Sequence, residues 1–188
     1  MLFSFKQKQE FKRASSVSTV QVKAPTTPTH WSPPSLGEVK LNFDGAVFPS
    51  LDVVGLGVVA RDSTGECVWW KTVCKQGLVE PEMVEAFAAR EAILLALRLG
   101  WPRVILEGDC ANLHLKLVSR LPDCSALGPI IRDIKYLVSS FVACSFSLIR
   151  RSGNKVAHCL ARRASISGSE GSCIPPDLSE LLLSDCGY

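Results

Sequence analysis

The chain has 188 residues, of which 47% are hydrophobic, so it can bury the core of one ordinary domain and is not an intrinsically disordered protein. Its formal net charge is only +3, but residues 1–37 hold five Lys or Arg and one Glu (net +4), and residues 166–188 hold four acids and no base (net −4). The middle, residues 38–165, therefore carries +3, which is compatible with a polyanionic partner but does not by itself indicate one.

The eight cysteines are scattered and include no CxxC pair, which argues against both a disulfide scaffold and a zinc ribbon. Several fall inside expected strands or helices, where a free thiol behaves as a small hydrophobic side chain. We therefore expect reduced thiols and an intracellular, reducing compartment, either the nucleus or the cytoplasm rather than an organelle.

Neither a signal peptide nor a membrane segment is expected. The N-terminal MLFSF meets Lys6 too soon to form the apolar region of a signal peptide. The most apolar stretch, residues 136–149, contains four serines and is too short to cross a bilayer.

Residues 1–36 are expected to form a flexible, basic arm, because they are polar and end in the proline-containing segment APTTPTHWSPPS. Three strands should follow, since apolar residues alternate or run continuously between turn sequences. They are expected within VKLNFDGAVF (39–48), VVGLGVVARD (53–62) and ECVWWKTVCK (66–75), as an antiparallel meander.

A helix is expected from Pro81 to about Leu99, because proline suits the first turn of a helix and Gly100 suits its end. Short apolar runs and amphipathic segments then predict a strand at 103–109, helices at 110–121 and 125–140, a strand at 142–150, and a helix at 154–165 with Asn154 as N-cap.

This order of elements predicts an α/β fold in which helices pack on the faces of a mixed sheet. The folded domain is expected to span residues 37–165. Residues 166–188 are expected to form an acidic C-terminal tail.

Three acids, Asp44, Glu85 and Asp109, fall at places in the expected core elements where structure alone does not favour an acid. Grouped carboxylates repel one another and cost folding energy unless cations or donors neutralise them. A strand parallel to the first would bring Asp109 beside Asp44, and Glu85 shares a helix face with small alanines that can lie close to a sheet. Such a cluster suits a hard divalent cation, Mg²⁺ first and Mn²⁺ second, and a pair of such ions can cleave a phosphodiester.

Each acid also has an ordinary structural interpretation, which the residues alone leave open. Asp44 before Gly45 could belong to a turn, and Glu85 could be an acid favoured by the helix dipole. Asp109 could be the N-cap of the helix that follows it.

Five segments in order resemble the plant ribonuclease H-like domains derived from non-LTR retrotransposons. They are WSPPSLGEVKLNFDGA, GLGVVARDSTGE, VEAFAAREAILLALRLG, VILEGDC and IRRSGNKVAHCLARRA, and together they span about residues 31–164. The resemblance implies a ribonuclease H-like fold with a five-stranded mixed sheet. It also implies a reverse transcriptase-associated, metal-dependent endonuclease that hydrolyses the RNA strand of RNA–DNA hybrids.

By this resemblance, Asp44, Glu85 and Asp109 match the first three metal-binding carboxylates, and His158 occupies the fourth catalytic position. Imidazole is a poor ligand for Mg²⁺ and is better suited to Mn²⁺, so His158 is the main departure from the catalytic pattern. The alternative is a structural histidine, either on the helix surface or packed against the sheet. A second departure is the loop IRRSGN, which lacks the histidine that efficient family members use in product release.

Nucleic-acid contacts are expected around the last helix. Residues 150–163 contain five Lys or Arg side chains and no acid, which could hold phosphates or form an ordinary solvated basic helix. Recognition of a hybrid would depend on minor-groove shape and the 2′-hydroxyl rather than on base identity. The candidate nucleic-acid-binding residues are Asn42, Asn112, Arg150, Arg151, Asn154 and Lys155.

Three functions stay open at this point: an active ribonuclease H, a domesticated nucleic-acid-binding module with weak or silent catalysis, and a retroelement relic without an independent role. An active enzyme must cleave a hybrid in the presence of a divalent metal. A silent module must bind nucleic acid with an affinity that falls with salt. No obligate protein partner is evident.

Overall fold

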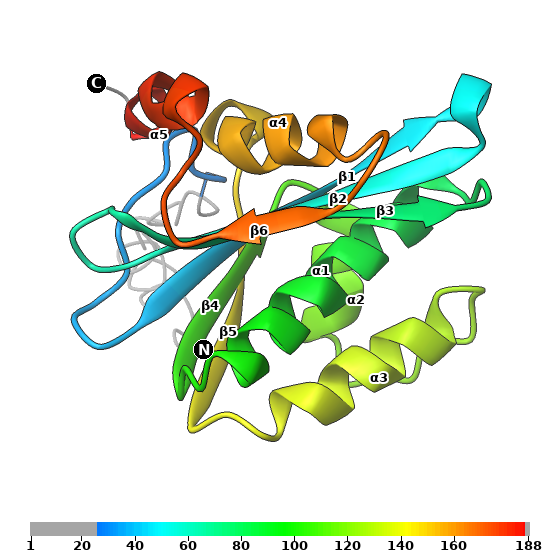
Figure 1. Ribbon diagram of the computed structural model, residues 1–188. Coiled ribbons are helices and arrows are strands. Elements are labelled where there is room, and N and C mark those ends of the chain that lie inside the picture. The colour runs from blue at the N-terminus through cyan, green and yellow to red at the C-terminus, as the bar shows by residue number, and fades with distance from the viewer. Residues whose placement is uncertain (1–25, 187–188) are drawn as a thin grey trace, which may run out of the picture.

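The computed structural model describes residues 26–186 and shows a mixed sheet with helices on both of its faces (Figure 1). The predicted α/β fold class is confirmed. Residues 1–25, most of the predicted arm, lie outside the described residues.

The sheet of the described chain has six strands in the spatial order β5-β4-β1-β2-β3-β6. Strands β1 to β3 form the expected antiparallel meander, and β4 and β5 continue the sheet on the other side of β1 in parallel. The bounds are Val39–Phe48 (β1), Val53–Arg61 (β2), Cys67–Gln76 (β3), Arg103–Gly108 (β4), Ala143–Leu148 (β5) and Ser169–Gly171 (β6).

The sixth strand departs from the five that the family resemblance implied, and it comes from the segment expected to be a tail. β6 pairs antiparallel with β3, and the backbone N–H of Ser169 also donates to the Thr72 hydroxyl at 2.9 Å. This pairing satisfies backbone groups along the outer edge of β3 that would otherwise face solvent. A Ser-Glu-Gly strand has no apolar alternation, so the sequence contained no signal for it.

Helices α1, α2 and α3 cover one face of the sheet, and α4 and α5 cover the other (Figure 1). Three short 3₁₀ turns complete the described chain. The bounds are Pro81–Arg98 (α1), Ala111–Val118 (α2), Gly128–Val138 (α3), Lys155–Arg163 (α4) and Ser179–Asp185 (α5), with turns at Pro49–Leu51, Arg151–Gly153 and Pro176–Leu178.

Helix α4 lies directly on β2, because two glycines of that strand leave room for its backbone. A Cβ added at Gly55 would lie 2.2 Å from the carbonyl oxygen of Ala161, and one added at Gly57 would lie 2.3 Å from its amide nitrogen. The facing helix residues Ala157 and Ala161 are small and fully buried. The close approach fixes the distance of α4 from the sheet.

Helix α1 reaches the other face of the sheet in the same way. A Cβ added at Gly45 of β1 would lie 2.7 Å from the Val84 side chain and 2.9 Å from its backbone carbonyl carbon. The first turns of α1 therefore press against β1 beside Asp44.

Segments outside the predicted domain bounds pack on the domain. Trp31, from the predicted arm, is 3% exposed, and its backbone N–H donates to the backbone carbonyl of Asp185 at 2.7 Å. Leu178, from the predicted tail, is buried in a small second core with Val59, Val156 and Leu160. The folded unit therefore includes residues on both sides of the 37–165 range.

Within residues 26–186 no helix has both the length and the apolar character needed to cross a membrane.

Substitution Gly57→Ala is expected to lower the free energy of unfolding by about 1–3 kcal/mol, because the added methyl group meets the α4 backbone, which cannot rotate away. Urea denaturation followed by circular dichroism measures this loss. Gly171→Ala is the control, since its Cβ would meet only the Trp70 side chain at 3.1 Å. Equal losses in the two variants would contradict the tight contact between α4 and β2.

Candidate active site

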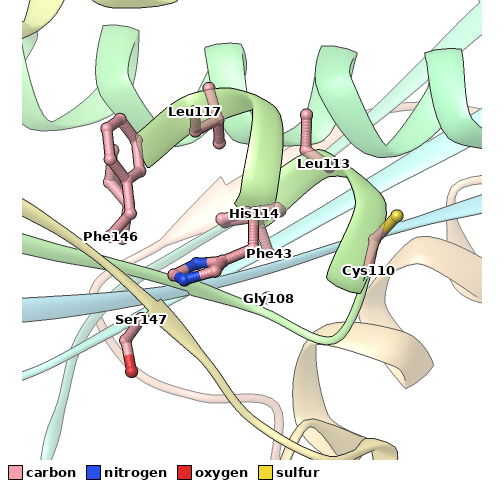
Figure 2. Close-up of a pocket in the computed structure, with 9 residues that line it drawn as sticks. Phe43, Gly108, Cys110, Leu113, His114, Leu117, Phe146 and Ser147 are labelled. Atoms are coloured by element: carbon pink, nitrogen blue, oxygen red, sulfur yellow. The ribbon is translucent and has the colours of Figure 1, made fainter. Parts of the chain in front are cut away.

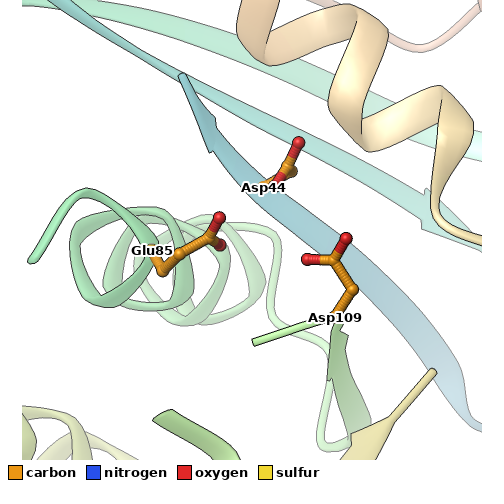
Figure 3. A group of neighbouring side chains, drawn as sticks. All are labelled: Asp44, Glu85 and Asp109. Carbon is orange, nitrogen blue, oxygen red and sulfur yellow. The ribbon is translucent and has the colours of Figure 1, made fainter. Parts of the chain in front are cut away.

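Three acids meet where β1, α1 and the end of β4 come together (Figure 3). Asp44 comes from the middle of β1, Glu85 from α1, and Asp109 directly follows β4. One carboxylate oxygen from each residue lies within 4.8 Å of the other two. Asp44 is 4% exposed, and the other two are partly buried. The structure thus gathers the three acids that the sequence singled out.

The register of the parallel pair β1–β4 explains how two of the acids meet. Asn42 of β1 is paired with Glu107 of β4. Asp44 and Asp109 each lie two residues further along, so both extend from the same end of the strand pair. Glu85 reaches them because Gly45 lets the first turns of α1 approach the strand.

Burial and mutual repulsion oppose ionisation of this cluster in the absence of a cation. Burial, followed by the charge of Asp44 and a hydrogen bond to it, raises the pKa of Glu85 to about 10. Burial and the charge of Asp44 also raise the pKa of Asp109, while the Arg151 guanidinium acts in the opposite direction.

The donor set fits a divalent cation. Oxygen Oε2 of Glu85 is buried and has no hydrogen-bond partner among the described residues. A buried, unpartnered carboxylate oxygen costs free energy that a cation can offset. Three carboxylates at this spacing are the oxygen ligands that Mg²⁺ and Mn²⁺ take in proteins.

His158, the predicted fourth position, lies beside the acids. It is in the first turn of α4, and its Nδ1 is 2.6 Å from Oδ2 of Asp44. Nη2 of Arg151 lies 3.2 Å from its Nε2. Because a carboxylate only accepts and a guanidinium only donates, Nδ1 donates to Asp44 and Nε2 accepts from Arg151.

An open cleft of about 480 Å³ runs beside the acid cluster. Glu85 and Asp109 line it together with Asn112 and Arg151, two of the predicted nucleic-acid-binding residues. Both of these are exposed, as is the neighbouring Arg150. The cleft is therefore lined by carboxylates, by the guanidinium group of Arg151 and by the side-chain amide of Asn112.

Three other predicted nucleic-acid contacts do not fit this surface. Asn42 and Asn154 are fully buried, and Asn42 donates to Oδ1 of Asn154 at 3.2 Å, so neither side chain is available to a ligand. The ammonium group of Lys155 donates to the Ser184 hydroxyl at 2.8 Å, on the side of α5. The amides of Asn42 and Asn154 therefore stabilise the core, and the ammonium group of Lys155 points toward α5.

Sequence reasoning missed Glu82, which also lines the cleft. Its Oε1 is buried and has no partner among the described residues. The available signal was its position three residues before Glu85, which puts both carboxylates on one side of α1.

A second pocket, under α2, is too small for a ligand (Figure 2). Its volume is about 10 Å³, room for about one water molecule, and its walls are mainly apolar, including Phe43, Leu113 and Phe146. Partial burial of His114 in this wall lowers its pKa. This pocket is a packing feature and not part of the site.

The sequence model of a protein family described as reverse transcriptase-like matches residues 42–164. That range includes all three acids and His158. No curated protein sequence matches the chain.

Solved structures of ribonucleases H share the fold. RNase H1 from the halophilic archaeon Halobacterium salinarum is 22% identical with a TM-score of 0.59, and the match covers 68% of this chain and 96% of that one. The RNase H domain from Mycobacterium tuberculosis is 18% identical with a TM-score of 0.62, covering 70% and 94%. An RNase H1 isolated from compost, solved in complex with an RNA/DNA hybrid, is 19% identical with a TM-score of 0.58, covering 67% and 95%. The ribonuclease H-like expectation is confirmed for the fold, and the plant retrotransposon origin stays a prediction.

The electrostatics of the cluster predict an unusual pH dependence for the metal-free protein. Between about pH 4.5 and 10 folded Glu85 keeps a proton that the unfolded chain releases, so stability falls as pH rises, by up to about 1.4 kcal/mol per unit. Glu85→Gln removes this slope and raises the free energy of unfolding at pH 7 by about 1–3 kcal/mol.

Urea denaturation in a chelator at several pH values between 5 and 8 measures both effects. Glu66→Gln removes an exposed carboxyl group in the turn between β2 and β3 and should leave the slope in place. A slope that persists in Glu85→Gln would contradict the assignment.

Proposed function

Because the chain belongs to the reverse transcriptase-like family, we propose that it is a metal-dependent ribonuclease H that hydrolyses the RNA strand of RNA–DNA hybrids. One observation carries the proposal: the ligand oxygens of Asp44, Glu85 and Asp109 lie within 4.8 Å of one another beside an open cleft. Acids brought together at a folding cost are expected where a cation compensates for their repulsion.

Asp44, Glu85 and Asp109 are the residues that would hold the cation. Mg²⁺ and Mn²⁺ both bind carboxylate oxygens, so either ion fits the set of three carboxylates, with Mg²⁺ as the first choice. The chemistry that a divalent ion supplies in such a site is activation of a water and stabilisation of the charge that develops on a phosphodiester.

The chain's own side chains would bind and orient the nucleic acid. Arg151 lines the cleft next to Asp109, where its guanidinium can donate two hydrogen bonds to one phosphate. Asn112, in the same wall, can donate to or accept from the sugar and base edges of a hybrid. Arg150, next to Arg151, adds a second exposed guanidinium group. One of the similar solved RNase H1 structures holds an RNA/DNA hybrid, which supports the proposed substrate class.

A nucleic-acid-binding module without catalysis is the second candidate, and the contact between His158 and Asp44 favours it. At 2.6 Å, the imidazole takes one of the oxygens that a cation would otherwise use. The basic loop at Arg150 and Arg151 would keep its affinity for phosphate in such a module.

The cysteines support the proposal that the protein works in a reducing compartment, in the nucleus or the cytoplasm. All eight lie within the described residues and all are free. Burial raises the pKa of Cys67 and of Cys144 to about 11, which keeps these thiols protonated and unreactive at neutral pH.

Cleavage of an end-labelled RNA–DNA hybrid, in Mg²⁺ and separately in Mn²⁺, tests the two candidates. We expect cleavage of the RNA strand that falls by more than about 100-fold in Asp109→Asn, because a metal-binding carboxylate is lost. Asp52→Asn, in an exposed turn where asparagine fits the left-handed backbone, is the control. A folded protein that binds the hybrid but cleaves it in neither metal would establish the silent module.

Arg151→Ala is expected to weaken binding of the hybrid and to reduce the slope of log affinity against log salt by about 1, because one phosphate contact is lost. Fluorescence anisotropy at several salt concentrations in a chelator measures this without cleavage. Arg132→Ala, which removes an exposed charge from α3, should leave the slope unchanged. Equal effects of the two substitutions would contradict a specific contact at Arg151.

A further inference from the structure

We propose that Asp185, in the last turn of α5, is a positioning residue of the site, because it caps helix α4 and thereby holds His158 against Asp44. The importance of this role for catalysis rests on the proposed function. The contacts that Asp185 makes exist without metal or substrate. They tie the C-terminal segment to the acid cluster.

Helix α4 begins without the side-chain cap that its sequence predicts. Asn154 is at the N-cap position, but within the described chain its side chain makes no capping hydrogen bond. Its Nδ2 donates instead to the backbone carbonyl of Phe43 on β1 at 3.0 Å, and its Oδ1 accepts from Asn42. The first amide groups of α4 therefore need another acceptor.

Asp185 supplies that acceptor from thirty residues further along the chain. Its Oδ1 accepts from the backbone N–H of Lys155 at 3.1 Å, and its Oδ2 accepts from that of Val156 at 3.4 Å. The carboxylate is fully buried and lies at the positive end of the helix dipole. It makes the hydrogen bonds that the side chain of an N-cap residue makes in other helices.

Buried groups on β1, on β2 and in the N-terminal segment hold Asp185 in place. Nη2 of Arg61, on β2, lies 3.5 Å from Oδ2 of Asp185, and both side chains are fully buried. The same Nη2 donates to Oδ1 of Asn42 at 2.9 Å. The Arg61 guanidinium stacks on the Trp31 ring at 3.9 Å from its centre, and the backbone N–H of Trp31 donates to the backbone carbonyl of Asp185. The carboxylate is thus fixed from the sheet and from the N-terminal segment.

The capped turn is the one that carries His158. His158 follows Lys155 by three residues, and its own backbone N–H makes the first bond of the helix, to the carbonyl of Asn154 at 3.1 Å. An uncapped first turn frays, and fraying here moves the imidazole that contacts Asp44. Asp185 therefore acts on the acid cluster through His158 and does not touch it directly.

Two measurements on the metal-free protein test the inference, and neither depends on cleavage. Hydrogen exchange reports the first turn of α4, and long-range ¹H–¹⁵N NMR reports the ring nitrogens of His158. In Asp185→Asn we expect the amide groups of the first turn to exchange about tenfold faster and the Nδ1 signal to move toward that of a free imidazole.

The matched control is Asp177→Asn. Asp177 is also an acid of the C-terminal segment paired with a base of α4, here Arg163, but this pair is exposed. We expect the His158 signal to stay unchanged in it, because exposed ion pairs contribute little.

A double variant covers the case in which Asp185→Asn leaves Arg61 unpaired and the protein does not fold. Arg61→Met with Asp185→Leu removes the cap and the buried cation together, so no charge is stranded in the core. A folded double variant whose His158 signal is displaced supports the inference. An unchanged His158 signal in either variant, or faster exchange spread evenly over all helices, overturns it.

Discussion

The buried side-chain amide of Asn42 is the point on which the other contacts of the site depend. Its Nδ2 donates to Glu107 on β4 and to Asn154 before α4, and its Oδ1 accepts from Arg61 on β2. One side chain in the centre of β1 therefore joins two neighbouring strands and the start of a helix. Because all these groups are buried, loss of any partner would leave an unsatisfied polar group in the core.

This network explains how the fold tolerates an acid cluster. Glu107 has its own partners in the network, Asn42, Lys40 at 3.3 Å and the Ser147 hydroxyl at 2.8 Å. The strands are thus fixed two residues before Asp44 and two residues before Asp109. The carboxylates cannot relax by strand movement, so burial, together with the charge of Asp44, raises the pKa values of Glu85 and Asp109. A site of this kind is preorganised for a cation.

Local patterns predicted the parts of this structure that local forces decide. The meander, α1 and the existence of strand β4 follow from apolar patterns and from turn residues, and the places of Asp44, Glu85 and Asp109 on these elements follow from them. The sequence did not predict that Asn42 and Asn154 would be buried, since Asn42 lies two residues before Asp44 and Asn154 lies in the basic segment 150–163, where we expected contacts with nucleic acid. It also did not reveal the cap by Asp185 or the strand β6, because both arise from partners far along the chain and neither has a pattern of its own.

Two side chains donate a hydrogen bond to Asp44, namely His158 and protonated Glu85. They differ in how firmly each is held, and this difference affects the choice between an enzyme and a silent module. The imidazole of His158 is held against Asp44 by the hydrogen bond from Arg151 and by the capped first turn of α4. The proton on Glu85 is held only because burial and neighbouring charge disfavour the carboxylate. A divalent cation held by the three acids would offset the cost of a charged Glu85, so Glu85 would lose its proton while the hydrogen bond between His158 and Asp44 could persist. His158 and a bound divalent ion would then be compatible, and the histidine does not by itself make the site inert.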